Sequence, residues 1–278
     1  MLENIAKLLP ESIKNFIRIF RDKIELTKLP ISRVSTNNLA LYQDAGLIKS
    51  IMNEDVFYQK WENVKKELEL LELPENTGGV NAGDQRAIAY LIWKYKPKRV
   101  LEIGTHIGCS TVHIATALRE LDDNDYSIVT VDIRDVNDEQ KKPWIFYKSP
   151  MSPKSLIEKV AFSQNVEFVV QPSVEFLRVS DEKFDFIFLD GGHSASLVYQ
   201  ELPLASKLLN KNGIILLHDY YPKNKAIWDN NSIIPGPYMA TERFIKEGND
   251  ILITPLGELP WETKRNSRYT SLAICYKK

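Results

Sequence analysis

Apolar residues recur at helical spacing in the segment from Pro10 to about Leu26. The apolar positions are Ile13, Phe16, Ile17, Phe20 and Ile24. The basic positions lie largely off that face and are Lys14, Arg18, Arg21 and Lys23. Such a basic amphipathic helix can touch a membrane surface. We expect it instead to pack on the main domain or on a partner subunit, as most amphipathic helices of globular proteins do.

A second helical pattern runs through VFYQKWENVKKELELLE, starting at Val56. Its apolar positions are Phe57, Trp61, Val64, Leu68 and Leu71, spaced four and three residues apart. The stripe is too short for a long coiled coil. We therefore expect residues 1–75 to form a helical cap that covers a pocket or supplies a homodimer interface, and residues 76–278 to form the main domain.

Beyond PENTGGVNAGDQ the pattern changes to short β-branched runs separated by helical stretches, which predicts a parallel sheet with crossover helices. The expected strands are residues 99–103, 127–132, 166–170, 184–190 and 213–219. Two further strands, at 250–255 and 270–276, have no long helix between them and predict an antiparallel hairpin at the sheet edge. The fold class is α/β: a doubly wound, Rossmann-like sheet of seven mostly parallel strands.

Composition narrows the classes of partner and compartment. Thirty-six basic against 37 acidic residues give a formal charge of -1, so the strongly basic surface typical of nucleic-acid binding is missing. Cys109 and Cys275 are too few for a disulfide scaffold or a thiolate zinc cluster, and we expect two free thiols. With neither a leader pattern nor a long apolar run, we expect a cytoplasmic protein without a membrane partner.

The segment LEIGTHIGCST combines a buried strand, a turn with two glycines and the start of a helix. Gly104 and Gly108 allow a sharp turn and a close ligand approach, while the helix start offers free N–H groups. Asp132 ends the next strand, where an acidic side chain can accept hydrogen bonds from ribose hydroxyls. The spacing fits dinucleotides and adenosyl cofactors alike, but G-x-x-x-G in place of G-x-G-x-x-G disfavours NAD.

Acidic residues and histidines follow two neighbouring strands, in LDGGHS and LLHDYY. Ligands bind at this carboxyl end of an open α/β sheet, so we expect Asp190, His193, His218 and Asp219 to converge beside the glycine loop. Such a set can bind a divalent cation. We predict His193 as the general base, because a neutral imidazole accepts a hydroxyl proton near pH 7. A structural role as a helix cap remains the alternative for His193.

LEIGTHIGCST, VDIRD and FDFIFLDGGHS together resemble class I S-adenosylmethionine-dependent methyltransferases, in particular the small-molecule O-methyltransferases of the macrocin and catechol types. The resemblance covers about residues 80–278 and implies S-adenosylmethionine as cofactor. It places Glu102, Gly104, Thr105, Gly108 and Ser110 around the methionine part. It assigns the ribose to Asp132, the adenine to Ile133, Arg134 and Ser173, and a further cofactor contact and a catalytic role to Asp190. Asp84 is either such a contact or a helix N-terminal acid.

The same resemblance implies Mg²⁺ or another divalent cation at Asp190 and Asp219, with His218 as a third ligand. Catechol-type enzymes have Asp-Asn where Asp219-Tyr220 stands, and macrocin-type enzymes have an acidic pair where His218-Asp219 stands. These departures leave the metal requirement open.

The expected reaction is methyl transfer to a hydroxyl of a small molecule, a secondary metabolite or a sugar. Aromatic residues of the long loops are expected to wall the acceptor site or to pack their own loops, and are Trp144, Phe146, Tyr147, Tyr220, Tyr221, Trp228 and Tyr238. Two alternatives stay open: an N- or C-methyltransferase of the same fold without a metal, and a non-catalytic adenosyl-binding protein.

Overall fold

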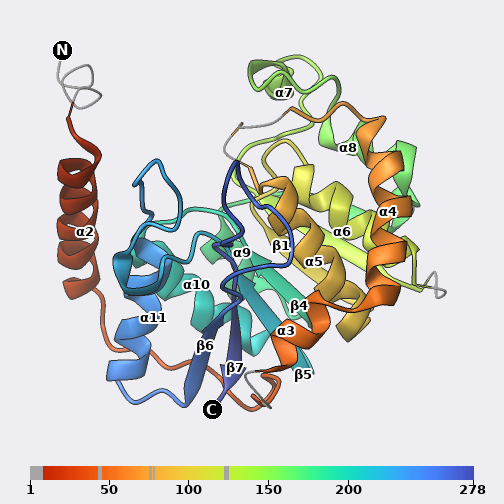
Figure 1. Cartoon of the computed structure of the whole chain (residues 1–278). Helices are drawn as coiled ribbons and strands as arrows, with labels where there is room; N and C mark the ends of the chain where they lie inside the picture. The colour runs from red at the N-terminus through yellow and green to blue at the C-terminus, as the bar shows by residue number, and fades with distance from the viewer. Residues whose placement is uncertain (1–8, 43–45, 75–76, 78, 122–124) are drawn as a thin grey trace.

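A computed structural model describes residues 9–42, 46–74, 77, 79–121 and 125–278. In this part of the chain, seven strands form one sheet in the order β3-β2-β1-β4-β5-β7-β6 (Figure 1). The strands are β1 (Arg99–Ile103), β2 (Ser127–Asp132), β3 (Val166–Val170), β4 (Phe184–Leu189), β5 (Leu209–Leu217), β6 (Ile251–Pro255) and β7 (Ala273–Lys277). The first five pair in parallel, and β7 lies antiparallel between β5 and β6.

This sheet confirms the predicted α/β class, and each expected strand has a counterpart. β5 begins at Leu209, earlier than expected, and ends at Leu217, so that His218 and Asp219 follow the strand. β7 begins at Ala273, because the residues before it form a loop that returns from β6. The predicted C-terminal hairpin is present, and its second strand carries the contact with β5.

Helices cover both faces of the sheet (Figure 1). The core on one face joins sheet residues such as Val100 and Phe186 to α3 (Gly46–Met52), α4 (Asp55–Glu69), α5 (Ala82–Tyr95), α6 (Cys109–Arg119) and α8 (Pro153–Val160). The core on the other face joins Leu101 and Ile187 to α9 (Ser173–Val179), α10 (Ala195–Lys207) and α11 (Gly236–Lys246). The short segments α7 (Pro143–Phe146), η1 (Ser163–Asn165) and η2 (Pro222–Asn224) lie in loops.

The two amphipathic helices near the N-terminus pack in opposite ways. In α4, the predicted stripe is buried against α5, with Trp61, Val64 and Leu68 all under 8% exposed. In α2 (Glu11–Thr27), the predicted helix is present, but its apolar stripe does not pack on the domain. The buried residues of α2 are Asp22 and Leu26, and the helix stands at the edge of the molecule beside α10 and α11 (Figure 1).

Residues 39–42 connect these two helical segments by running along the sheet. The Ala40 amide donates to the Gly213 carbonyl (2.9 Å), and the Tyr42 amide donates to the Lys277 carbonyl (3.0 Å). The chain before the glycine loop is thereby attached to both β5 and β7. Among the described residues, no helix has the length and apolar character needed to cross a membrane.

Candidate active site

The glycine loop turns sharply at the carboxyl end of β1. Gly104 has a φ of 103°, and a side chain there would collide with the carbonyl group of Asp190 after β4. Gly108 has a φ of 81° and lies against Pro153, where a Cβ atom would also be too close. Both glycines are therefore required by the local backbone, and the turn they form leads directly into the start of α6 at Cys109.

Glu102 lies beneath this loop, fully buried within β1. It accepts hydrogen bonds from the hydroxyls of Thr111 (2.5 Å) and Thr130 (2.6 Å), and Thr130 in turn pairs with Thr105 (2.6 Å). Burial raises the pKa of Glu102 to about 7, although its hydroxyl partners, Ser110 among them, act in the opposite direction. Glu102, Thr105 and Ser110 thus lie together, and the contacts of Glu102 hold the loop from below.

Asp132 is placed at the end of β2 with its carboxylate toward the glycine loop. It accepts hydrogen bonds from the backbone amides of His106 and Arg134, each at 2.9 Å. The Arg134 side chain also approaches the same carboxylate, with Nε 3.3 Å from Oδ1. Ile133 beside it is 69% exposed. A carboxylate fixed by two amides next to the glycine loop fits the hydroxyl pair of a ribose.

Ser173, predicted at the adenine edge, begins α9. Its hydroxyl donates to the carboxyl of Glu201 on α10, which is almost completely buried. The side chain of Ser173 is therefore engaged in packing α9 against α10. Tyr147, from the loop after β2, places its ring against His106 with 4.3 Å between ring centroids.

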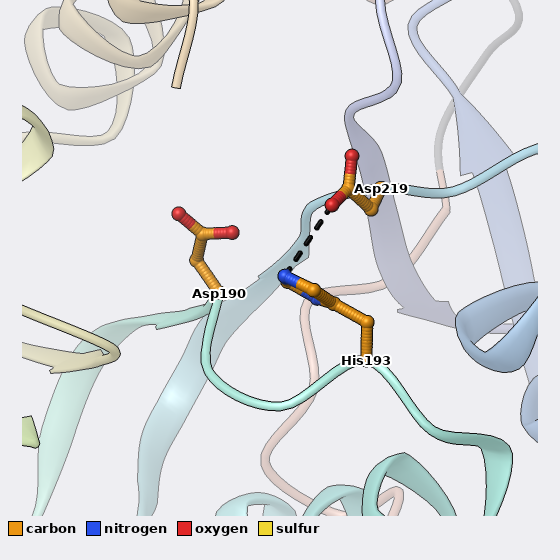
Figure 2. Close-up of side chains that lie close together, drawn as sticks. All are labelled: Asp190, His193 and Asp219. Carbon is orange, nitrogen blue, oxygen red and sulfur yellow. Dashed lines mark ion pairs between the residues drawn. The ribbon is translucent and has the colours of Figure 1, made fainter. Parts of the chain in front are cut away.

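Three ionisable side chains meet where β4 and β5 end (Figure 2). Ligand atoms of Asp190, His193 and Asp219 lie within 4.8 Å of one another. His193 Nε2 is 3.4 Å from Asp219 Oδ2, and the His193 ring reaches between the two carboxylates. The predicted convergence of these three residues is present in the structure. Two carboxylates and an imidazole form a donor set that fits a divalent cation.

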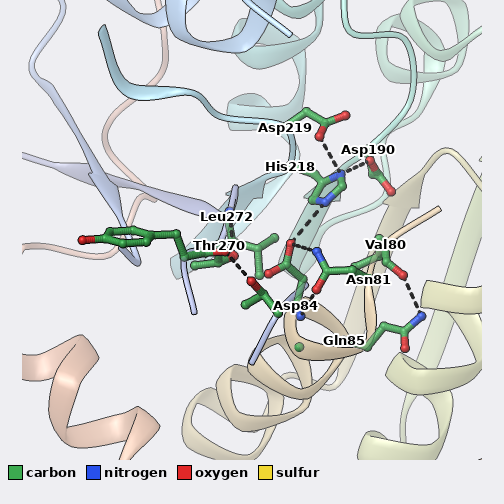
Figure 3. A network of polar contacts seen from close by, with 12 residues as sticks. Val80, Asn81, Asp84, Gln85, Asp190, His218, Asp219, Thr270 and Leu272 are labelled. Carbon is green, nitrogen blue, oxygen red and sulfur yellow. Dashed lines mark hydrogen bonds and ion pairs between the residues drawn. The ribbon is translucent and has the colours of Figure 1, made fainter. Parts of the chain in front are cut away.

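His218 lies between the cluster and the start of α5. Its Nδ1 lies 2.7 Å from Asp190 Oδ1, and its Nε2 lies 3.5 Å from Asp84 Oδ2 (Figure 3). Burial alone would lower the pKa of His218, but Asp190, Asp219 and Asp84 outweigh burial and raise that pKa well above its usual value. His218 Nδ1 also lies 3.8 Å from Asp219 Oδ1, so the ring contacts two members of the cluster, and its role as a third metal ligand stays a prediction.

Asp84 connects the start of α5 to this cluster. Asn81 caps α5 by accepting the Asp84 amide (3.0 Å), and its Nδ2 donates to Asp84 Oδ2 (2.8 Å) (Figure 3). Asp84 is therefore both the helix N-terminal acid that the sequence suggested and a partner of His218. It is completely buried, so it faces the site without reaching solvent.

Lys264 lies beside this site, and the sequence did not predict it because no recognisable motif surrounds it. It belongs to the loop between β6 and β7 and lies over the Trp228 ring, with Nζ 3.4 Å from the centroid. Burial lowers the pKa of Lys264 against the opposing influence of Asp219 and Asp84. Trp228 also contacts Tyr221, with 5.7 Å between centroids. Tyr220 packs instead against Tyr238, in the core beside α11.

Comparisons with known proteins agree with this arrangement. A family model described as a methyltransferase domain matches residues 101–220, which contain the glycine loop, Asp132, Asp190 and Asp219. No curated protein matches the chain.

Similar solved structures include the O-methyltransferase TomG from Streptomyces achromogenes in complex with SAM. It shares 16% identity with this chain at a TM-score of 0.52, and the match covers 98% of this chain and 100% of the TomG chain. An O-methyltransferase from Bacillus cereus in complex with SAH shares 19% identity with a TM-score of 0.52, covering 84% and 96%. PaMTH1 from Podospora anserina, bound to SAH, shares 20% identity with a TM-score of 0.51, covering 81% and 88%. The chain thus has the Rossmann-like fold of these solved methyltransferases, and its residues 101–220 match a methyltransferase-domain model.

Proposed function

We propose that this protein transfers a methyl group from S-adenosylmethionine to a hydroxyl oxygen of a small molecule, a secondary metabolite or a sugar. The observation that carries the proposal is the His193 imidazole beside Asp219 and near Asp190 (Figure 2), whose backbone contacts Gly104 of the glycine loop. An imidazole near a carboxylate can accept the proton of an attacking hydroxyl. A near-neutral chain with a formal charge of -1 favours a small acceptor over nucleic acid. Two buried free cysteines favour the cytoplasm.

The cofactor supplies an electrophilic methyl group when bound. The chain's own contribution is placement, because in-line displacement depends mostly on alignment. In this proposal, Asp132 accepts hydrogen bonds from the ribose hydroxyls, and Ile133 and Arg134 flank the adenine. Gly104 and Gly108 let the methionine end approach the backbone at the start of α6.

The His193 imidazole takes the acceptor proton in the proposed mechanism. Asp219, 3.4 Å from Nε2, orients the ring and stabilises the imidazolium that forms. Asp190 is held by His218 at 2.7 Å, which fixes its carboxylate beside the cofactor loop. Proton removal makes the acceptor oxygen a stronger nucleophile at the moment of attack.

The same cluster supports a variant of this function in which a divalent cation is bound. Asp190, His193 and Asp219 would hold the ion, since their ligand atoms lie within 4.8 Å of one another. A bound cation would acidify the acceptor hydroxyl by Lewis-acid polarisation. We expect dialysis against EDTA to abolish methyl transfer in that case and Mg²⁺ to restore it. If His193 acts as a free base, activity in EDTA is unchanged.

The cofactor assignment is tested by calorimetric titration of S-adenosylhomocysteine into the purified protein. We expect Asp132→Ala to weaken binding by about tenfold or more, because a charge-assisted hydrogen bond contributes about 1.5–3 kcal/mol. The matched control is Asp181→Ala, which removes an exposed carboxylate just before β4. We expect this variant to bind with unchanged affinity. Absence of binding to the folded wild type would contradict the proposal.

The base assignment is tested by transfer of labelled methyl groups to a panel of hydroxylated aromatics and sugars. We expect His193→Gln to lower kcat by about 10² to 10⁴, the usual contribution of a general base. S-adenosylhomocysteine affinity should remain as in wild type, which separates catalysis from binding. Full activity in His193→Gln would favour an N- or C-methyltransferase, and a protein that binds cofactor but methylates no acceptor would favour an adenosyl-binding role.

A further inference from the structure

Helix α2 docks on the molecule through its polar side. Asn15 Nδ2 donates to the Asn231 carbonyl (2.7 Å), and Arg18 donates to the Ser232 hydroxyl (3.1 Å). Asp22 is completely buried. These contacts fix the rotation of the helix about its axis, because a turn in either direction would break them and bury the apolar residues instead.

The apolar side of α2 consequently faces away from the molecule. Its five large residues are between 41% and 68% exposed and are Ile13, Phe16, Ile17, Phe20 and Ile24. The rings of Phe16 and Phe20 stack on each other, with centroids 6.3 Å apart. A contiguous exposed patch of this kind marks an interaction surface far more often than chance exposure.

Basic residues flank the apolar stripe of α2 on both sides. At 3.6 residues per turn, one edge carries Lys14, Arg21 and Lys28 and the other carries Lys23. Lys14 and Arg21 pair with acidic residues of α2, and Arg18 lies on the side turned toward the domain. The acidic residues all lie on the side turned toward the domain and are Glu11, Asp22 and Glu25. The outward side of the helix is therefore apolar along its centre and basic along both edges.

A groove beside α2 extends this basic surface. It has a volume of about 570 Å³ and lies between the second half of α2 and α11. Lys23, Lys246 and Arg243 line it together with Glu242, and Arg243 is paired with Glu247 at 2.7 Å, so the two lysines supply the positive charge of the groove. Basic side chains therefore continue from the edge of α2 onto α11.

Two partners could cover the apolar stripe, a second copy of the chain or a lipid surface, and the charge pattern favours the lipid surface. In a pair of α2 helices from two copies of the chain, the flanking positions of each helix would face each other, and basic residues would meet basic residues. An anionic lipid surface accepts both basic edges at once, while the phenylalanines enter the interface between headgroups and acyl chains.

We propose that α2 binds the surface of an anionic membrane, lying in the plane of the interface with Phe16 and Phe20 inserted and Lys23 and Lys28 at the headgroup phosphates. From the sequence we expected this stripe to pack on the main domain or on a partner subunit, and no membrane partner; the exposed stripe is the ground for proposing a membrane surface instead. The helix lies on the bilayer and does not cross it, which agrees with the absence of a spanning helix among the described residues. The proposal does not depend on the methyl-transfer reaction.

The test is co-sedimentation of the full chain with vesicles of equal parts phosphatidylglycerol and phosphatidylcholine, and with vesicles of phosphatidylcholine alone. We expect binding to the anionic vesicles, weaker binding to the neutral ones, and loss at high salt. The double variant Phe16→Glu/Phe20→Glu should bind at least about tenfold more weakly, since each buried phenylalanine contributes about 1.5–3 kcal/mol. Because both side chains are exposed, circular dichroism should show an unchanged fold.

The matched control is Leu70→Glu, which removes an 81% exposed leucine at the end of α4, away from α2 (Figure 1). It should bind vesicles as the wild type does. A wild type that stays in the supernatant, or binding that the double variant leaves intact, would overturn the proposal. So would light scattering that shows a wild-type dimer converted to a monomer by the double variant, because a second copy would then cover the stripe.

Discussion

The pKa of the Glu201 carboxyl group is higher in the folded protein than in an unfolded chain. Burial on α10 raises its pKa to about 7, and the hydrogen bond from Ser173 offsets only part of that rise. The folded protein therefore keeps this proton up to about pH 7, whereas the unfolded chain releases it near the ordinary value of 4.5. Unfolding releases a proton in that window, so raising the pH through it destabilises the folded state.

We expect Glu201→Gln to flatten the pH dependence of stability. Between about pH 4.5 and 7, the wild type should lose up to about 3 kcal/mol that the variant retains. Urea unfolding at pH 5 and pH 7.5 measures the difference, with Glu158→Gln at an exposed position of α8 as control. The pKa of Glu102 is raised in the same way, so Glu102 also makes stability fall as the pH rises. The Glu201→Gln variant therefore keeps the part of the pH dependence that comes from Glu102. Equal slopes in wild type and Glu201→Gln would contradict the assignment.

At the residue scale, the sequence predicted which side chains meet but not how their hydrogen bonds are distributed. Asp190, His193 and Asp219 converge because the carboxyl ends of adjacent parallel strands share one edge of the sheet. His218 follows β5 as expected, yet its ring pairs with Asp84, whose position depends on how α5 packs on the sheet. That packing joins residues far apart in the chain, and no local spacing encodes it.

At the element scale, the loop between β6 and β7 determines how α5 is held over the site. The Trp261 indole donates to the Gly83 carbonyl (2.9 Å) at the start of α5. A Cβ atom at Gly83 would lie 2.5 Å from Thr263 Cα and 2.6 Å from the Glu262 carbonyl oxygen. Backbone rather than flexible side chain occupies that space, so neither partner can yield without moving the loop.

We expect Gly83→Ala to displace this loop from α5 and to lower stability by about 1–3 kcal/mol, the usual cost of overpacking. S-adenosylhomocysteine binding should weaken as well, since Asp84 moves with the same turn of helix. Gly79→Ala is the matched control, because a Cβ there meets neighbours only at 3.7 Å or beyond. Thermal unfolding measures both variants. A Gly83→Ala protein as stable as the control would show that the loop adapts.

Hydrophobic periodicity was enough to predict where helices and strands occur along the chain. The predicted segments agree with α4 and with β1 to β4. The orientation of α2 could not be predicted in this way. Its apolar stripe has the pattern of a core-facing helix, but hydrogen bonds from Asn15 and Arg18 to residues 231–232 turn that stripe outward. Periodicity identifies the two sides of a helix and leaves open which side the rest of the molecule binds.

At the scale of the whole molecule, the described N-terminal segments, residues 11–42 and 46–74, lie on both sides of the sheet: α2 packs against α10 and α11, and α3 and α4 pack against α5. We proposed a helical region at 1–75 and a methyltransferase region at 76–278. The contacts of α4 indicate that the two regions depend on each other for stability. Trp61 on α4 packs against His113 on α6, with 6.1 Å between ring centroids, and is 7% exposed.

We expect Trp61→Ala to destabilise the entire protein by about 3–5 kcal/mol while unfolding stays a single transition. Urea titrations followed by circular dichroism and by fluorescence should coincide for the variant as for the wild type. Lys65→Ala, exposed on the same helix, is the control and changes stability little. Two separated transitions in Trp61→Ala would instead mean that α4 melts independently of the sheet.

The position of β7 between β5 and β6 bears on how the protein is made in the cell. The ribosome completes β5 at Leu217 but must still synthesise residues 218–272 before β7 begins. Throughout that interval the apolar end of β5, residues 215–217, lacks its partner strand β7, and unpaired edges invite association with other chains. Nascent protein is thus most vulnerable to aggregation late in translation, and chaperone dependence should be concentrated there.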